Sequence, residues 1–318
     1  MPLKPFILDC DTGRDDALAL WCAIALGLPL AGAVASYGNV VMTSVLDNTA
    51  RVLSLAGWDN IPLFAGASRP MRHHAAYENI VAPRQKKSGN GLCNIHLPRS
   101  TRGLPDYAGP DGLAEQIAAI SRKKGPLDYI ITGPATNFAG ICDAMGGRTG
   151  DIISRVTMMA GKFDELWDRI PGADFNLVAD PYAARFILEQ GIKIRFVPMN
   201  TTWPVFLNLP DVQSLVPATS LARTAQDIMI AHCRYFAPEP VFRFHDPAAL
   251  MAVLAPEGFV DAKVDIVLDE TREFGRVIET ENGFPAQIYR SDEKAQQEFL
   301  NRILSALGLS RGTAAAVA

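Results

Sequence analysis

Short apolar runs and amphipathic stretches alternate along most of this 318-residue chain. The apolar runs are nearly unbroken, which is typical of strands that are covered on both faces. The stretches between them place apolar residues three and four positions apart, and this spacing predicts helices. The alternation favours βαβ units and an α/β fold: one open, mostly parallel sheet flanked by helices, as in Rossmann-like proteins.

The expected strands are Phe6–Asp9, Leu30–Ser36, Ile61–Phe64, Asp128–Thr132, Arg155–Met159 and Lys193–Pro198. The expected helices are Asp15–Leu26, Val45–Ala56, Gly112–Ser121, Pro181–Gln190, Pro247–Leu254 and a last one from about Asp292 to Leu307. A small antiparallel extension is expected from Val264–Leu268, Arg276–Thr280 and Gln287–Tyr289. We expect a single domain over residues 1–310 and a disordered tail over residues 311–318.

One long segment interrupts the alternation. Residues 69–110 are rich in Pro, Gly, Arg, Lys and His. Long irregular segments inside a compact domain are usually functional. We therefore expect this segment to act as a lid or to contact a substrate.

Composition narrows the classes of partner. Hydrophobic residues make up 48% of the chain, enough for a large core, and no apolar run is long enough to span a membrane. The net charge of −4 argues against nucleic acid or an anionic membrane surface as a partner. Five widely spaced cysteines without a Cys-x-x-Cys pair indicate a reduced protein. Because a strand begins by Phe6, we expect no signal peptide and a cytoplasmic location.

Four carboxylates fall within eight residues: Asp9, Asp11, Asp15 and Asp16. An apolar strand leads into them, and a helix follows the turn at Gly13. Helix capping would account for Asp15 and Asp16 but not for all four. Like charges packed into one turn repel each other unless a cation compensates them. The cluster therefore predicts a site for a cation that prefers oxygen ligands, such as Ca²⁺ or Mg²⁺.

Further polar motifs follow the later strands. They are Tyr37-Gly38-Asn39, Thr132-Gly133-Pro134-Ala135-Thr136-Asn137, Asp174-Phe175-Asn176 and Phe244-His245-Asp246-Pro247. The carboxyl ends of parallel strands meet at one edge of a sheet, where α/β proteins bind ligands. We therefore expect these residues to converge on one crevice.

These motifs resemble those of a known family. Asp-Cys-Asp-Thr-Gly-Arg-Asp-Asp-Ala-Leu-Ala-Leu (9–20) is similar to the signature of the inosine–uridine-preferring nucleoside hydrolases. Segments 132–137, 174–176, 180–184 and 245–247 resemble further motifs of that family, in the same order. The resemblance spans about residues 5–255. It implies a nucleoside hydrolase fold and an enzyme that cleaves the N-glycosidic bond of ribonucleosides to give free base and ribose.

The resemblance also implies a cofactor and its ligands. A Ca²⁺ ion would be held by Asp11, Asp16, Asp246 and the backbone carbonyl of Thr132, and the attacking water would be bound to it. Asp11 would take the proton of this water as general base. The family commonly forms homodimers or homotetramers.

The remaining site residues follow from the same resemblance. Asp15, Asn39 and Asn176 would hold the ribose hydroxyls. His245 would donate a proton to the leaving base, although a histidine at the start of a helix can also serve packing alone. Cleavage builds positive charge on the ribose ring, and an acidic site stabilises that charge.

The chain departs from the family at the lid side. Many members carry a His-Gly pair where this chain has Ser88-Gly89, and His73, His74 and His96 do not match its spacing. An ungapped alignment places Asp168 and Asp174 where the family contacts the ribose 5′ end with an asparagine and a glutamate. We therefore expect an altered or non-standard sugar at the 5′ side, or slower catalysis.

Two other functions remain open at this stage. The Asp9-x-Asp11-Thr12 segment also resembles the nucleophile motif of haloacid-dehalogenase-type phosphatases, with Asp9 as nucleophile and Mg²⁺ as cofactor. The third hypothesis is a non-catalytic homologue that binds ribose and a cation. Aromatic residues that could stack on a base, or belong to the core, are Trp167, Tyr235, Phe236, Phe242 and Phe244.

Overall fold

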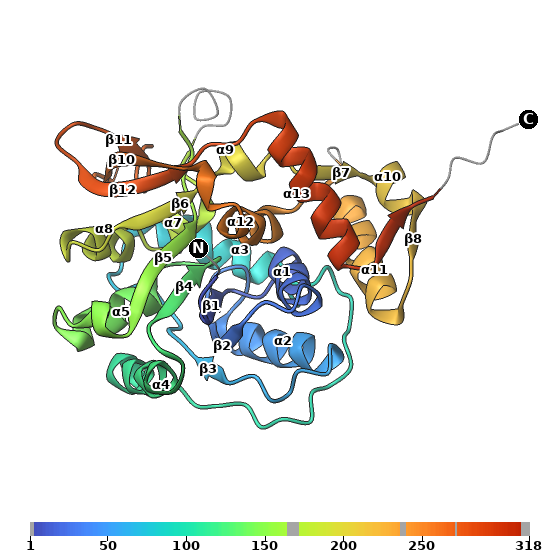
Figure 1. Ribbon diagram of the computed structural model, residues 1–318, viewed down its shortest axis with the longest axis horizontal. Helices are drawn as coiled ribbons and strands as arrows, with labels where there is room; N and C mark the ends of the chain where they lie inside the picture. Colours follow the sequence, from blue (N-terminus) through green and yellow to red (C-terminus); the bar gives the residue numbers. More distant parts are fainter. Residues whose placement is uncertain (1–2, 164–171, 236–239, 271, 313–318) are drawn as a thin grey trace, which may run out of the picture.

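A nine-stranded sheet forms the centre of the molecule (Figure 1). The computed structural model describes residues 3–163, 172–235, 240–270 and 272–312. Within them the strand order is β11-β10-β12-β6-β5-β4-β1-β2-β3. All neighbours from β12 to β3 pair in parallel, and β10 runs antiparallel to both of its neighbours. The expected fold class, an open and mostly parallel α/β sheet, is confirmed.

The strands of this sheet are β1 (Phe6–Cys10), β2 (Leu30–Ala35), β3 (Leu63–Ala65), β4 (Leu127–Ile131), β5 (Ile153–Met159), β6 (Ile194–Val197), β10 (Phe259–Ile266), β11 (Val277–Glu279) and β12 (Phe284–Tyr289). Two small antiparallel pairs lie beside it, made by β7 (Phe206–Asn208) with β9 (Val241–Arg243) and by β8 (Leu215–Pro217) with β13 (Leu309–Arg311).

The helices are α1 (Arg14–Ala25), α2 (Met42–Leu55), α3 (Ala82–Lys87), α4 (Gly109–Lys124), α5 (Thr136–Met145), α7 (Phe175–Ala179), α8 (Pro181–Glu189), α9 (Met199–Thr202), α10 (Leu209–Ser214), α11 (Ser220–Tyr235), α12 (His245–Leu254) and α13 (Glu293–Ala306). Short helical turns are η1 (Tyr77–Val81), η2 (Thr149–Asp151) and η3 (Pro256–Gly258).

Helices cover both faces of the sheet (Figure 1). Phe6, Leu8 and Cys10 of β1 join the hydrophobic cluster beneath α1, α2, α11, α12 and α13. Ile7 points to the other face and joins the cluster beneath α4, α5 and α8. A strand with apolar residues on both faces has no reason to alternate with polar ones. This is why unbroken apolar runs in the sequence predicted the strands of the sheet.

The sheet reverses its direction of growth between β1 and β4. From β1 the chain moves outward through β2 to β3, then crosses back to β4 on the other side of β1 and continues to β5 and β6. The carboxyl ends of β1 and β4 therefore flank a topological switch point, where α/β sheets bind ligands. Asp11 follows β1 and Thr132 follows β4, so the expected site begins there.

The C-terminal strands differ in part from the expected antiparallel extension. Strand β10 does pair antiparallel with β11 and β12. However, β12 also pairs in parallel with β6, through Ala286, Gln287 and Ile288, and so joins the main sheet. Strand β13 includes Arg311, the first residue of the expected tail, and residues 313–318 lie outside the described residues.

Two longer helices, α5 and α11, were not predicted, and neither were the short helices α3, α7, α9 and α10 or four strands of three residues. The α11 sequence carries buried residues at helical spacing, including Ala222, Ala225, Ile228 and Met229, so its pattern was present. The strands β7, β8, β9 and β13 are too short to produce a pattern. Segment 69–110, expected to be a loop, contains η1, α3 and the first residues of α4.

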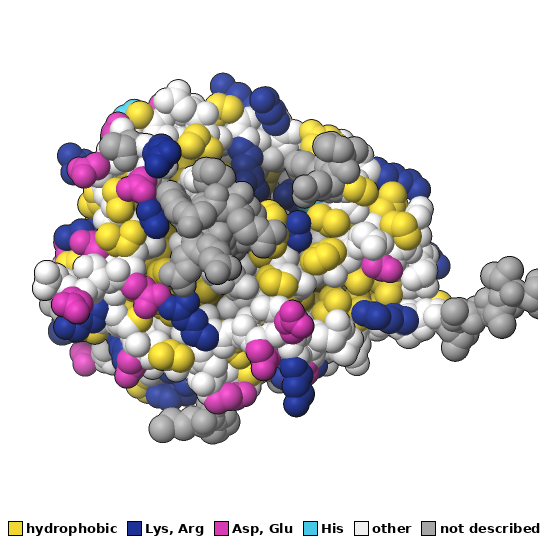
Figure 2. Space-filling model, turned by 90° about the horizontal axis from the view of Figure 1, so that it is seen from above, with side chains coloured by type: hydrophobic (Ala, Val, Ile, Leu, Met, Phe, Trp, Pro, Cys, Tyr) yellow, Lys and Arg dark blue, Asp and Glu magenta, His cyan; other side chains and the backbone are white. Residues whose placement is uncertain are grey.

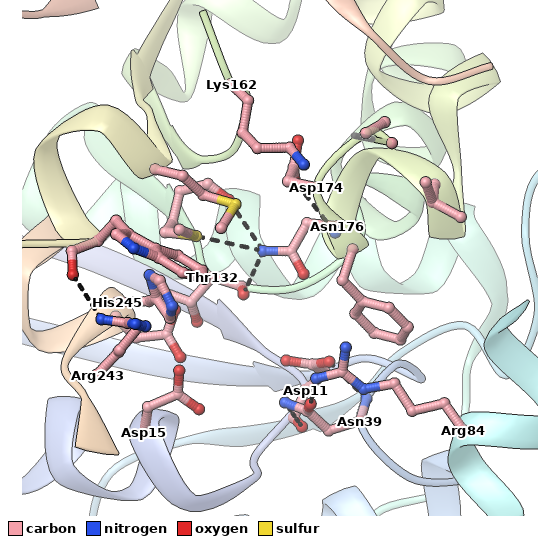
Figure 3. A pocket seen from close by; sticks show the side chains of 18 of the residues that line it. Asp11, Asp15, Asn39, Arg84, Thr132, Lys162, Asp174, Asn176, Arg243 and His245 are labelled. Atoms are coloured by element: carbon pink, nitrogen blue, oxygen red, sulfur yellow. Dashed lines mark hydrogen bonds between the residues drawn. The ribbon is translucent and has the colours of Figure 1, made fainter. Parts of the chain in front are cut away.

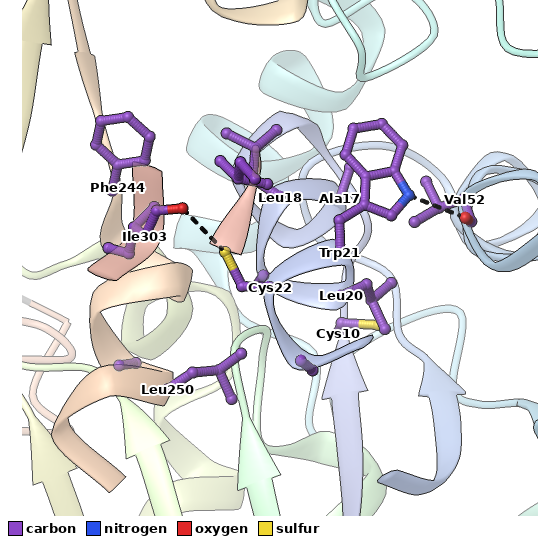
Figure 4. Close-up of a cluster of buried hydrophobic side chains, with 14 of the residues drawn as sticks. Cys10, Ala17, Leu18, Leu20, Trp21, Cys22, Val52, Phe244, Leu250 and Ile303 are labelled. Atoms are coloured by element: carbon purple, nitrogen blue, oxygen red, sulfur yellow. Dashed lines mark hydrogen bonds between the residues drawn. The ribbon is translucent and has the colours of Figure 1, made fainter. Parts of the chain in front are cut away.

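Trp21 offers a test of the packing between α1 and α2. Its indole is 1% exposed, and its Nε1 donates a 3.0 Å hydrogen bond to the carbonyl of Val52 (Figure 4). We expect Trp21→Ala to lower the free energy of unfolding by about 3–5 kcal/mol, because it leaves a cavity and an unpaired carbonyl. Trp21→Phe keeps most of the apolar volume and should cost clearly less. Urea unfolding followed by circular dichroism measures both; equal losses would contradict the packing argument.

Among the residues that the structure describes, no helix is both long enough and apolar enough to cross a membrane.

Candidate functional site

A pocket of about 780 Å³ opens at the carboxyl edge of the sheet (Figure 3). It is lined by eight of the predicted site residues: Asp11, Asp15, Asn39, Thr132, Asp174, Asn176, His245 and Asp246. Asp16 lies directly behind this surface and is fully buried. Asp168 lies outside the described residues. The predicted site residues that the structure describes therefore converge at one pocket, as expected from the strand ends.

Two helices begin at the pocket and carry its acidic cluster. Asp15 and Asp16 are in the first turn of α1, and Asp246 is in the first turn of α12. Carboxylate oxygens of these three residues lie within 4.8 Å of one another. The N-terminal ends of both helices favour negative charge, which helps to hold the three carboxylates together.

Asp16 has a capping role as well. Its Oδ2 accepts a 3.0 Å hydrogen bond from the Gly13 N–H, and its Oδ1 accepts a 2.9 Å bond from the Thr132 hydroxyl. Helix capping therefore accounts for part of the acidic motif, as the sequence analysis had considered for Asp15 and Asp16. It does not explain why Asp246, from the far end of the chain, joins the same cluster.

Burial and repulsion from neighbouring carboxylates raise the pKa values of Asp16 and Asp246. Burial is the larger cause of the raised pKa of Asp246, followed by repulsion from Asp15 and Asp16. The same two causes raise the pKa of Asp16 to about 7, with Asp15 as the repelling neighbour. A divalent cation would relieve this repulsion. The donor set of carboxylate oxygens fits a hard ion such as Ca²⁺ or Mg²⁺.

Asp11 lies beside this cluster rather than within the set of three. Its Oδ2 accepts a 2.6 Å hydrogen bond from the backbone N–H of Asn39. The turn approaches so closely because residue 38 is glycine: a Cβ there would lie 2.0 Å from Asp11 Oδ2. Burial, and next repulsion from Asp16, raise the pKa of Asp11, while Arg84 lowers it. The set of three thus contains Asp15, to which the resemblance gives the ribose hydroxyls, while the roles of Asp11 and Asp15 toward a cation stay predictions.

Asn176 links the two inner strand ends. Its Nδ2 donates to the carbonyls of Thr132, at 2.8 Å, and Met159, at 2.9 Å. Its side-chain oxygen points into the pocket (Figure 3). The fixed amide can therefore accept a hydrogen bond from a ligand hydroxyl.

Asp174 has a local role that the sequence reading missed. It caps α7, and its carboxylate accepts backbone N–H bonds from Gly161 (2.7 Å), Asn176 (3.1 Å) and Leu177 (3.2 Å). Burial raises its pKa to about 6, against the lowering effect of these bonds. The carboxylate is thus turned toward the backbone, and the side chain of Lys162 lies beside it in the pocket.

His245 stands at the first position of α12. Its Nδ1 lies 2.8 Å from the Thr202 hydroxyl, and Trp203 packs beside its ring. Burial lowers the pKa of His245 to about 4, so the ring is neutral at pH 7. A neutral imidazole still has one N–H donor.

Asp9 faces away from the pocket. Its carboxylate accepts hydrogen bonds from the Tyr129 hydroxyl and from Asn137 Nδ2, both at 2.9 Å. Burial raises its pKa to about 7. Asp9 therefore ties β1 to β4 and α5, and it is not placed to act as the nucleophile of a phosphatase.

The aromatic residues of the pocket differ from the candidates. Phe242 and Phe244 are buried in the core, and the Tyr235 hydroxyl donates to the carbonyl of Lys87. Trp167 and Phe236 lie outside the described residues. Among the described residues, the Phe and Trp side chains that line the pocket are Phe175, Trp203 and Phe274.

The lid-side histidines are not in the pocket. His74 is buried, with Nε2 3.2 Å from the Ala179 carbonyl and Nδ1 accepting from the Tyr77 N–H. The Ser88 hydroxyl donates to the Arg84 carbonyl at the end of α3. It is Arg84 itself, with Ala76 and Ile80, that brings segment 69–110 to the pocket. The segment therefore reaches the pocket through residues that were not named, and its role as a lid or substrate contact stays a prediction.

Fold and site together define an α/β protein whose acidic pocket, at the switch point of its sheet, suits a divalent cation. The profile of the family described as inosine-uridine preferring nucleoside hydrolase matches residues 6–304. The chain belongs to this family. Both the resemblance seen in the sequence and the expectation of an enzyme that hydrolyses nucleosides are confirmed.

Known proteins agree with this assignment. The pyrimidine-specific ribonucleoside hydrolase RihA of Shewanella oneidensis is 31% identical over 267 residues, which cover 80% of this chain and 79% of that protein. Among solved structures, the plant nucleoside hydrolase PpNRh1 superposes with a TM-score of 0.78 at 20% identity, over 96% of this chain and 99% of that one. A purine-preferring ribonucleoside hydrolase from Gardnerella vaginalis gives 0.77 at 21% identity, over 95% and 99%. At these identities the structural matches show a common fold.

Proposed function

We propose that this protein hydrolyses the N-glycosidic bond of ribonucleosides with the help of a bound Ca²⁺ ion, and releases free base and ribose. The observation that carries the proposal is the meeting of the half-buried Asp15 with the buried Asp16 and Asp246, whose negative charges repel one another, at the switch point of the sheet. Asp11, Thr132 and Asn176 surround them with further oxygen and amide groups.

The ion would be held by Asp16 and Asp246, with Asp11, Asp15 and the Thr132 carbonyl as the further oxygen groups at hand. When bound, it would supply the positive charge that lowers the pKa of the attacking water. Asp11 is the general base in this proposal. The Asn39 N–H fixes its Oδ2, and positive charge from the cation and from Arg84 keeps its carboxyl group ionised.

The remaining residues orient the ribose and stabilise its developing charge. Asp15 and the side-chain oxygen of Asn176 would accept hydrogen bonds from ribose hydroxyls, next to Asn39. As the glycosidic bond breaks, the ring carbon becomes electron-poor, and nearby carboxylates stabilise it more than they stabilise the neutral substrate.

We propose that His245 assists the leaving base as a neutral donor. If the Thr202 hydroxyl donates to Nδ1, the ring proton is on Nε2, which can donate to the base. The low pKa of His245 argues against an imidazolium as the acid at neutral pH.

Location and assembly are part of the proposal. All five cysteines are free, and four of them are buried, which supports a reducing compartment such as the cytoplasm. The resemblance to the family supports a homodimer or homotetramer, which sedimentation of the purified chain would test.

Base release from the purified full chain tests the hydrolase function. We expect uridine, cytidine, inosine or adenosine to release free base, measured by chromatography, in the presence of Ca²⁺. Removal of divalent cations by a chelator should lower kcat at least about 100-fold, because the cation contributes several kcal/mol to the reaction. Added Ca²⁺ should restore it.

The control variant is Asp143→Asn, which removes an exposed carboxylate on α5. It should keep the activity and the chelator response of the wild type. If the calcium-loaded wild type binds ribose but releases no base from any of the four nucleosides, the chain is a binding protein and the hydrolase proposal is wrong.

A further inference from the structure

Arg84 brings segment 69–110 into contact with the residues proposed to hold the ribose. Lys and Arg side chains lie in the hollow on the face of the molecule shown in Figure 2, and Arg84 is one of the arginines that line the pocket. Its Nη2 donates a 3.1 Å hydrogen bond to Asn39 Oδ1, and Figure 3 shows the two side chains together. Arg84 belongs to α3, whereas Asn39 follows β2. The bond therefore joins two parts of the chain that are far apart in sequence.

The bond from Arg84 decides which way the Asn39 amide faces. A guanidinium group has donors only, so it can bond to the amide oxygen but not to the NH2 group. Asn39 Nδ2 lies 3.4 Å from Asp16 Oδ2 and 3.5 Å from the Asp11 carbonyl, and both of these oxygens are acceptors. These contacts are longer than the bond from Arg84 and hold the amide less firmly. Turned by 180°, the amide would place its NH2 against the guanidinium group, so Arg84 keeps the NH2 on the side of the acidic cluster.

A displacement of Asn39 would affect more than its own amide. The amide is closely packed, because a Cβ at Gly13 would lie 2.8 Å from Asn39 Nδ2. The backbone N–H of Asn39 donates the 2.6 Å bond that holds Asp11 Oδ2. The position of Asn39 therefore matters both for the group that would hold the ribose and for the proposed general base.

The surroundings of Arg84 hold its guanidinium group in place. Val81, just before α3, is fully buried in a cluster that contains Tyr37, two residues before Asn39. The Arg84 guanidinium carbon lies 3.9 Å from the centre of the Phe175 ring. A stacked guanidinium group has already lost part of its freedom, so its hydrogen bond forms at a smaller entropic cost.

We propose that Arg84 is a positioning residue for the hydrolysis: it fixes the Asn39 amide, and so makes recognition of the ribose depend on where segment 69–110 lies. The inference rests on the proposed hydrolase function and deepens it. A ribose hydroxyl can donate to Asp15 while it accepts from the fixed NH2 of Asn39. These bonds orient the ring for attack by water, so Arg84 affects the rate although no bond to Arg84 forms or breaks in the reaction.

Arg84→Met tests this role in the calcium-loaded full chain. Methionine keeps an unbranched apolar side chain against Phe175 but removes the donor and the charge. We expect kcat/KM for base release from uridine or inosine to fall about 10- to 100-fold, as for the loss of one charged hydrogen bond. The loss should depend on the amide: in an Asn39→Ala background, Arg84→Met should cost less than about threefold. Single-turnover measurements at high enzyme concentration extend the range to the slower double variant.

Two further variants serve as controls. Arg72 is an exposed arginine of the same segment, its guanidinium carbon lies 4.9 Å from the Tyr182 ring centre, and it is not among the described residues that line the pocket. Arg72→Met should therefore leave kcat/KM within about twofold of the wild type. Arg84→Lys keeps the charge but not the planar group, so its activity should lie between those of the wild type and Arg84→Met.

Calcium affinity separates positioning from a general loosening of the site. The charges of Asp11 and Asp15 act on Arg84, so its positive charge is near the proposed ion site. Removal of this charge should leave the dissociation constant of Ca²⁺, measured by calorimetric titration, unchanged or lower. A site that had only loosened would bind Ca²⁺ more weakly.

The outcomes keep this inference apart from the hydrolase function. If Arg84→Met keeps the wild-type kcat/KM, or loses as much with Asn39→Ala as without it, Arg84 does not act through Asn39 and the inference is wrong. If Ca²⁺ binding weakens together with activity, the role of Arg84 is structural and the inference is again wrong. In both cases the hydrolase function stands. If the calcium-loaded wild type releases no base from either nucleoside, the hydrolase function itself fails.

Discussion

Asp246→Asn will strongly reduce base release and, in the absence of divalent cations, will leave the protein at least as stable as the wild type. The loss of a carboxylate ligand should reduce kcat/KM about 10³-fold, which corresponds to roughly 4 kcal/mol of transition-state stabilisation. The gain in stability has a separate cause. Burial and repulsion from Asp15 and Asp16 disfavour the charged form of Asp246 in the cation-free state, and asparagine removes this repulsion.

Thermal unfolding in chelator and in excess Ca²⁺ measures both effects. With chelator, the Tm of Asp246→Asn should equal or exceed that of the wild type. With Ca²⁺, the wild type should gain more, because only it holds the ion tightly. Asp143→Asn serves again as the exposed control. An Asp246→Asn protein that gains as much Tm from Ca²⁺ as the wild type would show that the cluster does not hold the ion through Asp246.

Asp11→Asn is expected to lower kcat about 10³- to 10⁴-fold at saturating Ca²⁺, since an amide cannot accept the proton of the attacking water. The substitution keeps an oxygen for the Asn39 N–H, so the turn at Gly38 should stay in place. Steady-state kinetics and calorimetric titration with Ca²⁺ separate the loss of a base from the loss of a ligand. A kcat within tenfold of the wild type, once Ca²⁺ is saturating, would remove Asp11 from the role of base.

Much of the fold could be predicted from the sequence because the physical causes of its strands and helices are local. Strands buried on both faces produce unbroken apolar runs, and β1, β2 and β4 begin and end within a residue of their predicted limits. The pairing of β12 with β6 could not be predicted from the sequence. Its residues alternate like those of any hairpin, and only packing against α8 and β6 decides that the strand joins the main sheet.

The acidic half of the site was predictable for the same reason. Asp11, Asp15 and Asp16 follow one strand, and parallel strands bring Thr132 and Asn176 to the same edge. The approach of Arg84 and Arg243 to the same pocket could not be predicted from the sequence. Arg84 comes from a short helix within segment 69–110, and Arg243 from a strand of three residues. Their approach to the pocket depends on tertiary contacts with Phe175 and Trp203, which leave no periodic pattern in the sequence.

Asp174 was predicted at the correct location, but its carboxylate caps a helix instead of facing the ligand. The sequence placed it in the pocket, where it lies. It is also the residue before a short helix, and an aspartate in that position competes for the first free N–H groups of the helix. The backbone of α7 and of Gly161 takes up its oxygens, and a reading based on spacing alone could not show this.

The acidic cluster also constrains the order in which the molecule can be completed. Asp15 and Asp16 belong to the first helix of the chain, and Asp246 belongs to α12, after most of the sheet strands. Contacts between residues so distant in sequence form late, because the intervening chain must first be ordered. During synthesis, a chain that ends before α12 would display the aspartate motif without its third carboxylate. Cation uptake should therefore wait until α12 has packed against α1, so that a chain truncated before α12 neither captures the ion nor acts on a nucleoside.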